Sequence, residues 1–449
     1  MKGPIIMKFG GTSVADADRL RGVANLAKER ADAGVLLVLS AFSGVTDGLF
    51  AAGRAAVSGD EKEALALLGK MLERHKSTAA ELLSVSPSAL PDSVEAALAS
   101  AESDLSAVLK GAALLRALPE RSMDILSGRG ELLSTAILAS YMGVPWIDAR
   151  TVMRTDSRFG CAKPQTDEIR ALARQKILPL IGPGKIAVTQ GYIGGDASGA
   201  PTTLGRGGSD YSASLFGAAL GATEIQIWTD VEGVLTCDPR IVKAARPVET
   251  LGYDEAAELA AFGAKVLHPS TILPAVELGI PVTVRNSMLP EGRFTTISRE
   301  SASGEGVTAL ASRAPVTVIT VRTPRMLGGS GFLASIFETF GRRGVSVDLV
   351  STSEVSVSAT VDGKQVVDEL VSDLAEFGEV RVERDRAVVA LVGERLLKTP
   401  GVPGKALAAL EDIDVEMISL GSNEINLSLV VERGQAAEAQ RRLHAAFFE

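Results

Sequence analysis

Residues 8–14, Lys-Phe-Gly-Gly-Thr-Ser-Val, follow directly on the short apolar run of residues 5–7 and precede the helical spacing of residues 17–30. This order predicts a strand, a tight turn and a helix N-terminus. Glycines let backbone N–H groups approach an anion, the helix N-terminus favours negative charge, and a lysine adds a full positive charge. The spacing fits neither the P-loop nor the Gly-x-Gly-x-x-Gly pattern. It predicts a phosphate-binding turn of another type, with an ordinary tight turn as the alternative.

Composition narrows the class of protein. A chain of 449 residues is expected to hold two to four domains, and its net charge of −9 argues against a nucleic-acid binder. Cys161 and Cys237 lack metal or redox spacing, so we expect buried or half-buried free thiols in a reducing cytosol. The three histidines share no local metal-ligand spacing. Because no segment resembles a signal peptide or a membrane span, we expect a soluble cytoplasmic protein with no nucleic-acid or membrane partner.

The first two thirds of the chain have an α/β pattern. Apolar runs at residues 35–39, 186–189 and 225–228 end at clusters of glycine, serine, threonine or aspartate, and helical spacing lies between them. Such runs indicate strands that are buried on both faces of a mostly parallel sheet. Ligands of these sheets bind outside the carboxyl ends of the strands. We therefore predict one catalytic domain over residues 1–305.

Beyond a linker at residues 301–306, short strands and helices alternate twice in nearly the same order. Residues 316–383 predict β-α-β-β-α-β, and residues 387–447 repeat that order without the last strand. This internal repeat predicts two small α+β domains, residues 314–385 and 386–449, with ligand sites where they meet. A purely structural repeat is the alternative.

Further charged clusters fall at predicted strand-to-helix junctions. Residues 205–210, Gly-Arg-Gly-Gly-Ser-Asp, combine glycines with Arg206, whose planar fork suits a carboxylate or phosphate. Glu131 opens a predicted helix, where it either complements the helix dipole or binds an ammonium group. Arg240 ends a loop that follows a buried strand, and Lys265 lies in a segment that ends a helical stretch. Together these clusters predict a site for a nucleoside triphosphate and an acidic co-substrate.

The motifs at residues 8–14, 204–211, 228–230 and 263–269 match, in order, the signatures of the aspartate kinases. Residues 331–334 and 346–356 resemble the first ACT module of the monofunctional, lysine-sensitive aspartokinase III type. The resemblance implies an amino acid kinase fold, a mostly parallel sheet sandwiched by helices, followed by tandem α+β ACT domains whose boundaries can be interleaved.

The same resemblance implies the reaction of ATP with L-aspartate to give ADP and 4-phospho-L-aspartate, the first committed step towards lysine, threonine and methionine. It also implies feedback inhibition by L-lysine, with threonine, alone or with lysine, as the alternative effector. The nucleophile is already ionised at neutral pH, since aspartate side chains titrate near pH ~4, so no general base is needed. The implied assembly is a homodimer through the ACT domains or a homotetramer.

By resemblance, residue roles fall into three groups. Lys8 is the catalytic cation, and Asp210 either orients Lys8 and the substrate or contacts Mg²⁺, which otherwise arrives with ATP. Substrate contacts are expected from Thr46, Glu131, Arg206 and Ser209. Nucleotide contacts are expected from Lys8, Phe9, Gly10, Gly11, Thr229, Asp230, Arg240 and Lys265. The residues expected to hold lysine are Met326, Phe332, Leu333, Val347, Asp348, Thr352, Ser353 and Glu354.

Two other functions remain open at this point. A different amino acid kinase, such as acetylglutamate, glutamate or uridylate kinase, would share the sheet and the phosphate turn. A catalytically silent amino-acid sensor would use the ACT domains alone, and we would expect it to have lost Lys8, Arg206 or Asp210. All three residues are present.

Overall fold

The computed structural model describes residues 3–263, 269–299, 306–327, 329–365, 367–421 and 423–449. Contacts divide the chain into two compact units. The first consists of Met1–Val234 and Val266–Arg299, and the second of Leu235–Lys265 and Glu300–Glu449. The chain therefore passes between the units three times, and residues 235–265, expected within the catalytic domain, group with the C-terminal part.

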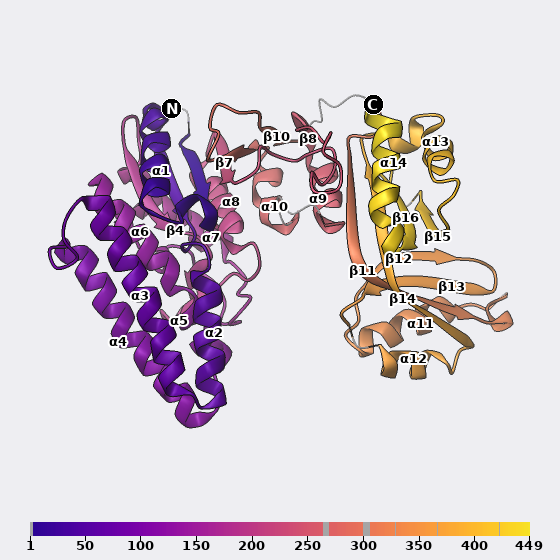
Figure 1. Cartoon of the computed structure of the whole chain (residues 1–449), viewed down its shortest axis with the longest axis horizontal. Coiled ribbons are helices and arrows are strands. Elements are labelled where there is room, and N and C mark those ends of the chain that lie inside the picture. The colour runs from indigo at the N-terminus through magenta and orange to yellow at the C-terminus, as the bar shows by residue number, and fades with distance from the viewer. Residues whose placement is uncertain (1–2, 264–268, 300–305, 328, 366, 422) are drawn as a thin grey trace. The chain divides into compact units, whose positions relative to one another are not determined.

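The first unit is built on a mostly parallel sheet (Figure 1). All five residues of β2 (Val35–Leu39) are buried, because both faces of the sheet are covered, and this explains the continuous apolar run. The predicted parallel sheet is confirmed, with β10 antiparallel to β9 at its side. The strands lie in the order β3 (Trp146–Ile147), β4 (Ile186–Gln190), β2, β1 (Ile5–Phe9), β7 (Glu224–Thr229), β9 (Val282–Asn286) and β10 (Thr295–Ser298).

Helices cover both faces of this sheet. Met7 and Phe9 of β1 join one core cluster with alternate residues of β2. The pleat turns Lys8 to the other face, where α8 contacts β1. The first layer contains α1 (Ala17–Glu29), α2 (Val45–Ser58), α3 (Glu61–Leu83), α4 (Asp92–Leu115), α5 (Glu120–Ser127) and α6 (Arg129–Met142). On the other side lie α7 (Thr166–Lys176), α8 (Gly208–Leu220) and α10 (Pro269–Glu277), and a short hairpin is formed by β5 (Ile193–Gly195) and β6 (Pro201–Thr203).

The second unit contains a six-stranded antiparallel sheet shared by both α+β repeats. Its strands lie in the order β12 (Val347–Thr352), β13 (Ser356–Asp362), β11 (Ala309–Arg322), β14 (Glu379–Val392), β16 (Asn426–Glu432) and β15 (Val415–Leu420). Helices α11 (Phe332–Arg342) and α12 (Asp368–Leu374) pack in one core cluster. A second cluster holds α13 (Val402–Ala409) and α14 (Ala436–Phe448).

Two strands in this sheet are longer than the sequence predicts. Separate strands expected at residues 380–383 and 387–392 form the single strand β14, because β11 runs antiparallel along both. Asp385, with a φ of 59°, and register shifts on β11 absorb the irregularity between them. Residues 309–313 of β11 pair with 388–392, so a segment that precedes the first repeat supplies the strand that the second repeat lacks.

The segment 235–265 forms part of the second unit through a continuous core. It includes β8 (Thr250–Gly252) and α9 (Tyr253–Ala261). Cys237 and Val242 are buried in the cluster of α13 and α14, and Thr236 Oγ1 lies 3.0 Å from His444 Nε2. This segment is therefore held by the ACT-like part of the chain.

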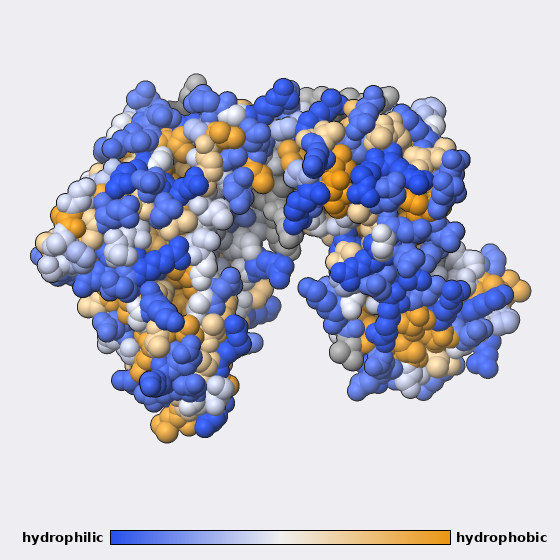
Figure 2. All heavy atoms as spheres, in the orientation of Figure 1, coloured by the Kyte–Doolittle hydropathy of each residue, from blue (hydrophilic) through white to orange (hydrophobic). Residues whose placement is uncertain are grey.

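The surface, one histidine and the two cysteines can be compared with what the sequence suggests. Figure 2 shows mostly hydrophilic residues on the visible face of both units, with hydrophobic residues in smaller groups. Among the described residues, no helix combines the length and apolar character needed to cross a membrane. His75 is packed in the core, and burial lowers its pKa to about 4. The expectation of a buried or half-buried thiol is wrong for Cys161, which is exposed on a loop, and is confirmed for Cys237, which is buried.

Candidate active site

Lys8 and Asp210 form the centre of the predicted site. Lys8 belongs to β1 and lies between Val38 of β2 and Ile227 of β7 in the parallel register. Its Nζ is 2.6 Å from Asp210 Oδ1, in the first turn of α8, and the two side chains are only 11% and 15% exposed. A nearly buried ion pair at the carboxyl end of a central strand is a place where a ligand anion can find a fixed positive charge.

The turn after β1 leaves little room for a side chain at Gly11, whereas Gly10 has ordinary contact distances. A Cβ on Gly11 would lie 3.0 Å from the carbonyl oxygen of Ala41, and one on Gly10 would lie 3.6 Å from Lys8 Nζ. The Gly10 N–H donates to the carbonyl of Trp228, and the Ser43 N–H donates to the carbonyl of Gly11. The N–H of Gly10 is therefore not free to donate to a ligand. The absence of a side chain at Gly10 leaves space for a ligand beside Lys8.

Phe9, expected at the nucleotide, has its side chain in the core. Its ring stacks on Trp228 with centroids 5.8 Å apart, and it is fully buried. Only its backbone can face a ligand. Thr229 and Asp230 follow at the end of β7, the strand beside β1, so the structure brings them to the same edge of the sheet as the Gly10–Gly11 turn.

The glycine-rich loop before α8 carries Arg206 and Ser209. Gly205 and Gly207 have φ values of +76° and +71°, a region that favours glycine. Ser209 accepts a hydrogen bond of 2.9 Å from the hydroxyl of Ser40, which follows β2 directly. Arg206 is exposed and forms no ion pair with a described residue, so its guanidinium is available to an anionic ligand.

Glu131 is a buried carboxyl group with an open bonding position. It lies in the first turn of α6, is 3% exposed, and its Oε2 has no hydrogen-bond partner among the described residues. Burial raises the pKa of Glu131 to about 7. An unpartnered buried carboxyl group of this kind can take a cation from a ligand.

The other predicted residues form no hydrogen bond or ion pair with Lys8 or Asp210 in the part of the chain that the structure describes. Thr46 is half-buried in the first turn of α2, just after the loop that contacts Gly11. Arg240 forms an ion pair of 2.6 Å with Asp238 in the second unit. Lys265 lies outside the described residues. The sequence does not predict Ser40, although its position directly after a buried strand is the available signal.

Comparison with known proteins identifies the family. The amino acid kinase family profile matches residues 3–286, and an ACT domain profile matches residues 319–368 and 389–447. The lysine-sensitive aspartokinase 3 of Escherichia coli (strain K12) is 37% identical over 463 residues, which cover 99% of each chain. The chain belongs to the aspartokinase family. The chloroplastic aspartokinase 1 of Arabidopsis thaliana is also 37% identical, over 99% of this chain and 80% of that protein.

Solved aspartokinase structures agree with this assignment. The E. coli aspartokinase III complex with aspartate and ADP, described as the R-state, has a TM-score of 0.84 and 36% identity, covering 99% of this chain and all of that one. The complex of the same protein with lysine and aspartate, described as the T-state, has a TM-score of 0.80 and 37% identity over the same shares. The predicted fold, an amino acid kinase domain followed by ACT domains, is confirmed.

In the aspartokinase ACT region, the residues expected to hold lysine surround the start of α11 and the strand β12. Gly331 caps α11 with a φ of +84°. Asp348 Oδ1 accepts a hydrogen bond of 2.9 Å from Arg313, a residue that the sequence does not predict. Within this set, Ser353 lies at the end of β12 beside Ser356, with their hydroxyl oxygens 2.7 Å apart.

The apolar members of that set pack largely into the core. Met326, Phe332 and Val347 are half-buried against the cluster of α11 and α12, and Phe332 packs edge-on against Phe377. Leu333 and Thr352 are exposed, as is Glu354. The side chains of this set that a ligand can reach are therefore mostly polar.

Proposed function

We propose that this aspartokinase transfers the γ-phosphoryl group of ATP to the side-chain carboxylate of L-aspartate, giving ADP and 4-phospho-L-aspartate. The observation that carries the proposal is that one unit holds both a cation at the end of β1, Lys8, which is paired with Asp210, and a buried carboxyl group, Glu131, whose Oε2 has no partner among the described residues. The E. coli relative whose complex contains aspartate and ADP supports it. The product would enter lysine, threonine and methionine biosynthesis.

The chemistry requires an anion to attack a polyanion, and charge neutralisation is therefore the main task of the protein. Lys8 bridges the attacking carboxylate and the γ-phosphoryl group. Before substrate binds, Asp210 holds Lys8 at 2.6 Å and so fixes the direction of its Nζ. The Gly10–Gly11 turn, with Thr229 and Asp230, accommodates the phosphates and the rest of ATP. Arg240 and Lys265 are proposed as nucleotide residues from the family resemblance alone.

The two charged groups of the substrate backbone are recognised separately. Arg206 pairs with the α-carboxylate through its planar fork, and Glu131 accepts the α-ammonium group. In the free protein burial raises the pKa of Glu131 to about 7, so the arriving ammonium group stabilises the ionised form. Thr46 and Ser209 add hydroxyl contacts.

The residues present also fit a magnesium ion that arrives with the nucleotide. Mg²⁺ is usually bound through one or two carboxylates together with substrate phosphates, and Asp210 is a carboxylate at the phosphate side of the site. When bound, the ion neutralises charge on the phosphate oxygens. Asp210 therefore either contacts the ion or continues to orient Lys8.

Regulation and assembly belong to the same proposal. L-lysine binds at the ACT region, with Asp348 and Glu354 accepting its two ammonium groups and the start of α11 receiving its carboxylate. The relative solved with lysine and aspartate supports this effector. We further propose a homodimer through the ACT domains, or a homotetramer, and a cytoplasmic location, which two free cysteines suit.

A hydroxamate assay tests this function, because hydroxylamine traps the acyl phosphate product. Purified protein with ATP, Mg²⁺ and L-aspartate should give hydroxamate, and L-lysine should suppress it. L-glutamate and N-acetylglutamate serve as control substrates. Turnover of a control substrate in place of L-aspartate would assign a different amino acid kinase activity, and inhibition by threonine without inhibition by lysine would change the effector.

A further inference from the structure

Asp124 is a buried carboxylate that holds two loops at once. It lies in α5 and is 2% exposed. Its two oxygens accept the N–H of Gly160 at 3.0 Å each, Oδ2 accepts the N–H of Thr203 at 3.0 Å, and Oδ1 accepts the Thr203 hydroxyl at 2.7 Å. Burying a charge is costly unless it is hydrogen-bonded, and all the donors here come from the loops.

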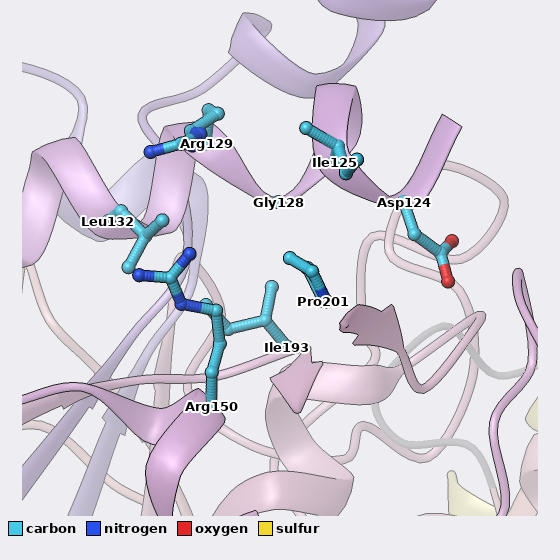
Figure 3. A pocket seen from close by; sticks show the side chains of 8 residues that line it. All are labelled: Asp124, Ile125, Gly128, Arg129, Leu132, Arg150, Ile193 and Pro201. Atoms are coloured by element: carbon cyan, nitrogen blue, oxygen red, sulfur yellow. The ribbon is translucent and has the colours of Figure 1, made fainter. Parts of the chain in front are cut away.

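Among the residues that the structure describes, no cation forms an ion pair with this carboxylate. In Figure 3 the Asp124 carboxylate points away from Arg129 and Arg150. Each arginine has an acidic partner of its own, since Arg129 pairs with Asp104 and Arg150 pairs with Asp148. The hydrogen bonds to Asp124 therefore serve to fix the backbone of the two loops.

One of these loops leads directly to the substrate-binding arginine. Thr203 ends β6, and only Leu204 and Gly205 separate it from Arg206. The Leu204 N–H donates to the carbonyl of Tyr192 at 2.9 Å. A Cβ on Gly205 would lie 3.3 Å from the carbonyl oxygen of Gly160, whose N–H Asp124 also accepts. The first residues of the Arg206 loop therefore lie against Gly160 and follow directly on Thr203, and these are the two residues that donate to Asp124.

Asp124 also lies close in sequence to Glu131, because α5 is followed directly by α6. The Gly128 N–H donates to the backbone carbonyl of Asp124, and α6 begins at the next residue with Glu131 in its first turn. A Cβ on Gly128 would lie 2.7 Å from Ile193 Cγ2, so the turn between α5 and α6 packs closely on β5. Asp124 therefore ties the helix that carries Glu131 to the loop that carries Arg206.

We propose that Asp124 is a positioning residue that sets the separation of Glu131 and Arg206, and so the fit of the site to the ammonium and carboxylate groups of the substrate. This inference rests on the proposed function. Asp124 has no role in phosphoryl transfer or in nucleotide contact. Loss of the Asp124 side chain should therefore weaken the binding of aspartate and not that of ATP.

Kinetics of Asp124→Ala and Asp124→Asn test the proposal. In Asp124→Ala we expect the KM for aspartate to rise about ten- to hundredfold, since small misplacements of binding groups have effects of this size, with the KM for ATP nearly unchanged. Asp124→Asn should recover part of the loss, because its amide oxygen still accepts backbone N–H groups and its NH₂ can donate to the Thr203 hydroxyl. If the alanine variant does not fold, the asparagine variant carries the test.

Asp196 offers a matched control. It is 4% exposed and accepts hydrogen bonds from the N–H groups of Ser198 and Ala200 and from the hydroxyls of Ser157 and Ser198, in the turn at the other end of the β5–β6 hairpin. Asp196→Ala should lower the thermal midpoint by a similar amount and leave the KM for aspartate near wild type.

A double variant separates positioning from a general loss of structure. In an Arg206→Ala background, Asp124→Ala should have little further effect on the KM for aspartate, because its action passes through Arg206. Additive effects, an unchanged KM for aspartate with a lowered kcat, or an equal rise in Asp196→Ala would overturn the proposal. Failure of the wild type to phosphorylate aspartate in the same assay would instead overturn the proposed function.

Discussion

Replacing Glu131 by glutamine should stabilise the free protein while weakening aspartate binding. Burial raises the pKa of Glu131 from 4.5 to about 7, and no described residue donates to its Oε2. In the unfolded chain the carboxyl group ionises above pH 4.5, whereas in the folded protein it keeps its proton up to about pH 7. Between these values the folded state binds more protons, so its stability falls as the pH rises from 4.5 to 7 and the full cost remains above pH 7.

The size of this cost follows from the displacement of the pKa. Each tenfold change in the ionisation equilibrium is worth about 1.36 kcal/mol, so the ionised Glu131 costs about 3 kcal/mol at pH 8 and less than about 1 kcal/mol at pH 5. Glutamine carries no charge at either pH. The difference in the free energy of unfolding between Glu131→Gln and the wild type should therefore grow in favour of the variant by about 2–3 kcal/mol from pH 5 to pH 8.

Chemical denaturation of both proteins at the two pH values, without ligand, measures this difference. Saturating aspartate should stabilise the wild type at pH 8 and the variant far less. Glu255→Gln is a suitable control, because the buried Glu255 carboxylate accepts hydrogen bonds from the Gly252 N–H and the Thr308 hydroxyl and should lose stability at both pH values. A stability difference between Glu131→Gln and wild type that does not change with pH would refute the reasoning.

Three further changes test the proposed roles. Lys8→Ala should lower turnover by orders of magnitude through lost charge stabilisation, and a variant that keeps more than about a tenth of wild-type turnover would show that Lys8 is not the bridging cation. Arg206→Ala should weaken aspartate binding by about 1.5–3 kcal/mol with little change in the KM for ATP, and the opposite pattern in steady-state kinetics would reverse the assignment. Asp348→Ala should abolish inhibition by lysine and leave uninhibited turnover intact, since its partner Arg313 retains Asp362 at 3.6 Å; inhibition curves that match the wild type would contradict this role.

The sequence predicts those parts of the fold that depend on neighbouring residues. The apolar run of β2 indicates a strand covered on both faces, and Gly11 marks a turn with little room for a side chain. The repeated order of short strands and helices likewise predicts two small α+β domains in the C-terminal part of the chain. These features follow from local periodicity and from the steric limits of the backbone.

Contacts between distant residues are not visible in such patterns. Asp124 and Thr203 are 79 positions apart, and Arg313 and Asp348 are 35 apart. Helix spacing around Asp124 is equally compatible with an ordinary surface acid. Only the folded chain shows that this carboxylate is buried and what it holds, and the same is true of Ser40 and its contact with Ser209.

The threefold passage of the chain between its two units limits how such an enzyme can gain or lose regulation. A fragment cut near residue 305 would keep residues 235–265 but would lack the ACT side chains that bury Cys237 and Val242, such as Leu391 and Leu443. The shortened protein would expose an apolar surface next to Arg240. Recombination at the linker would therefore separate the ACT region from a segment that shares its core, whereas substitutions within the ACT region can change the effector without this cost.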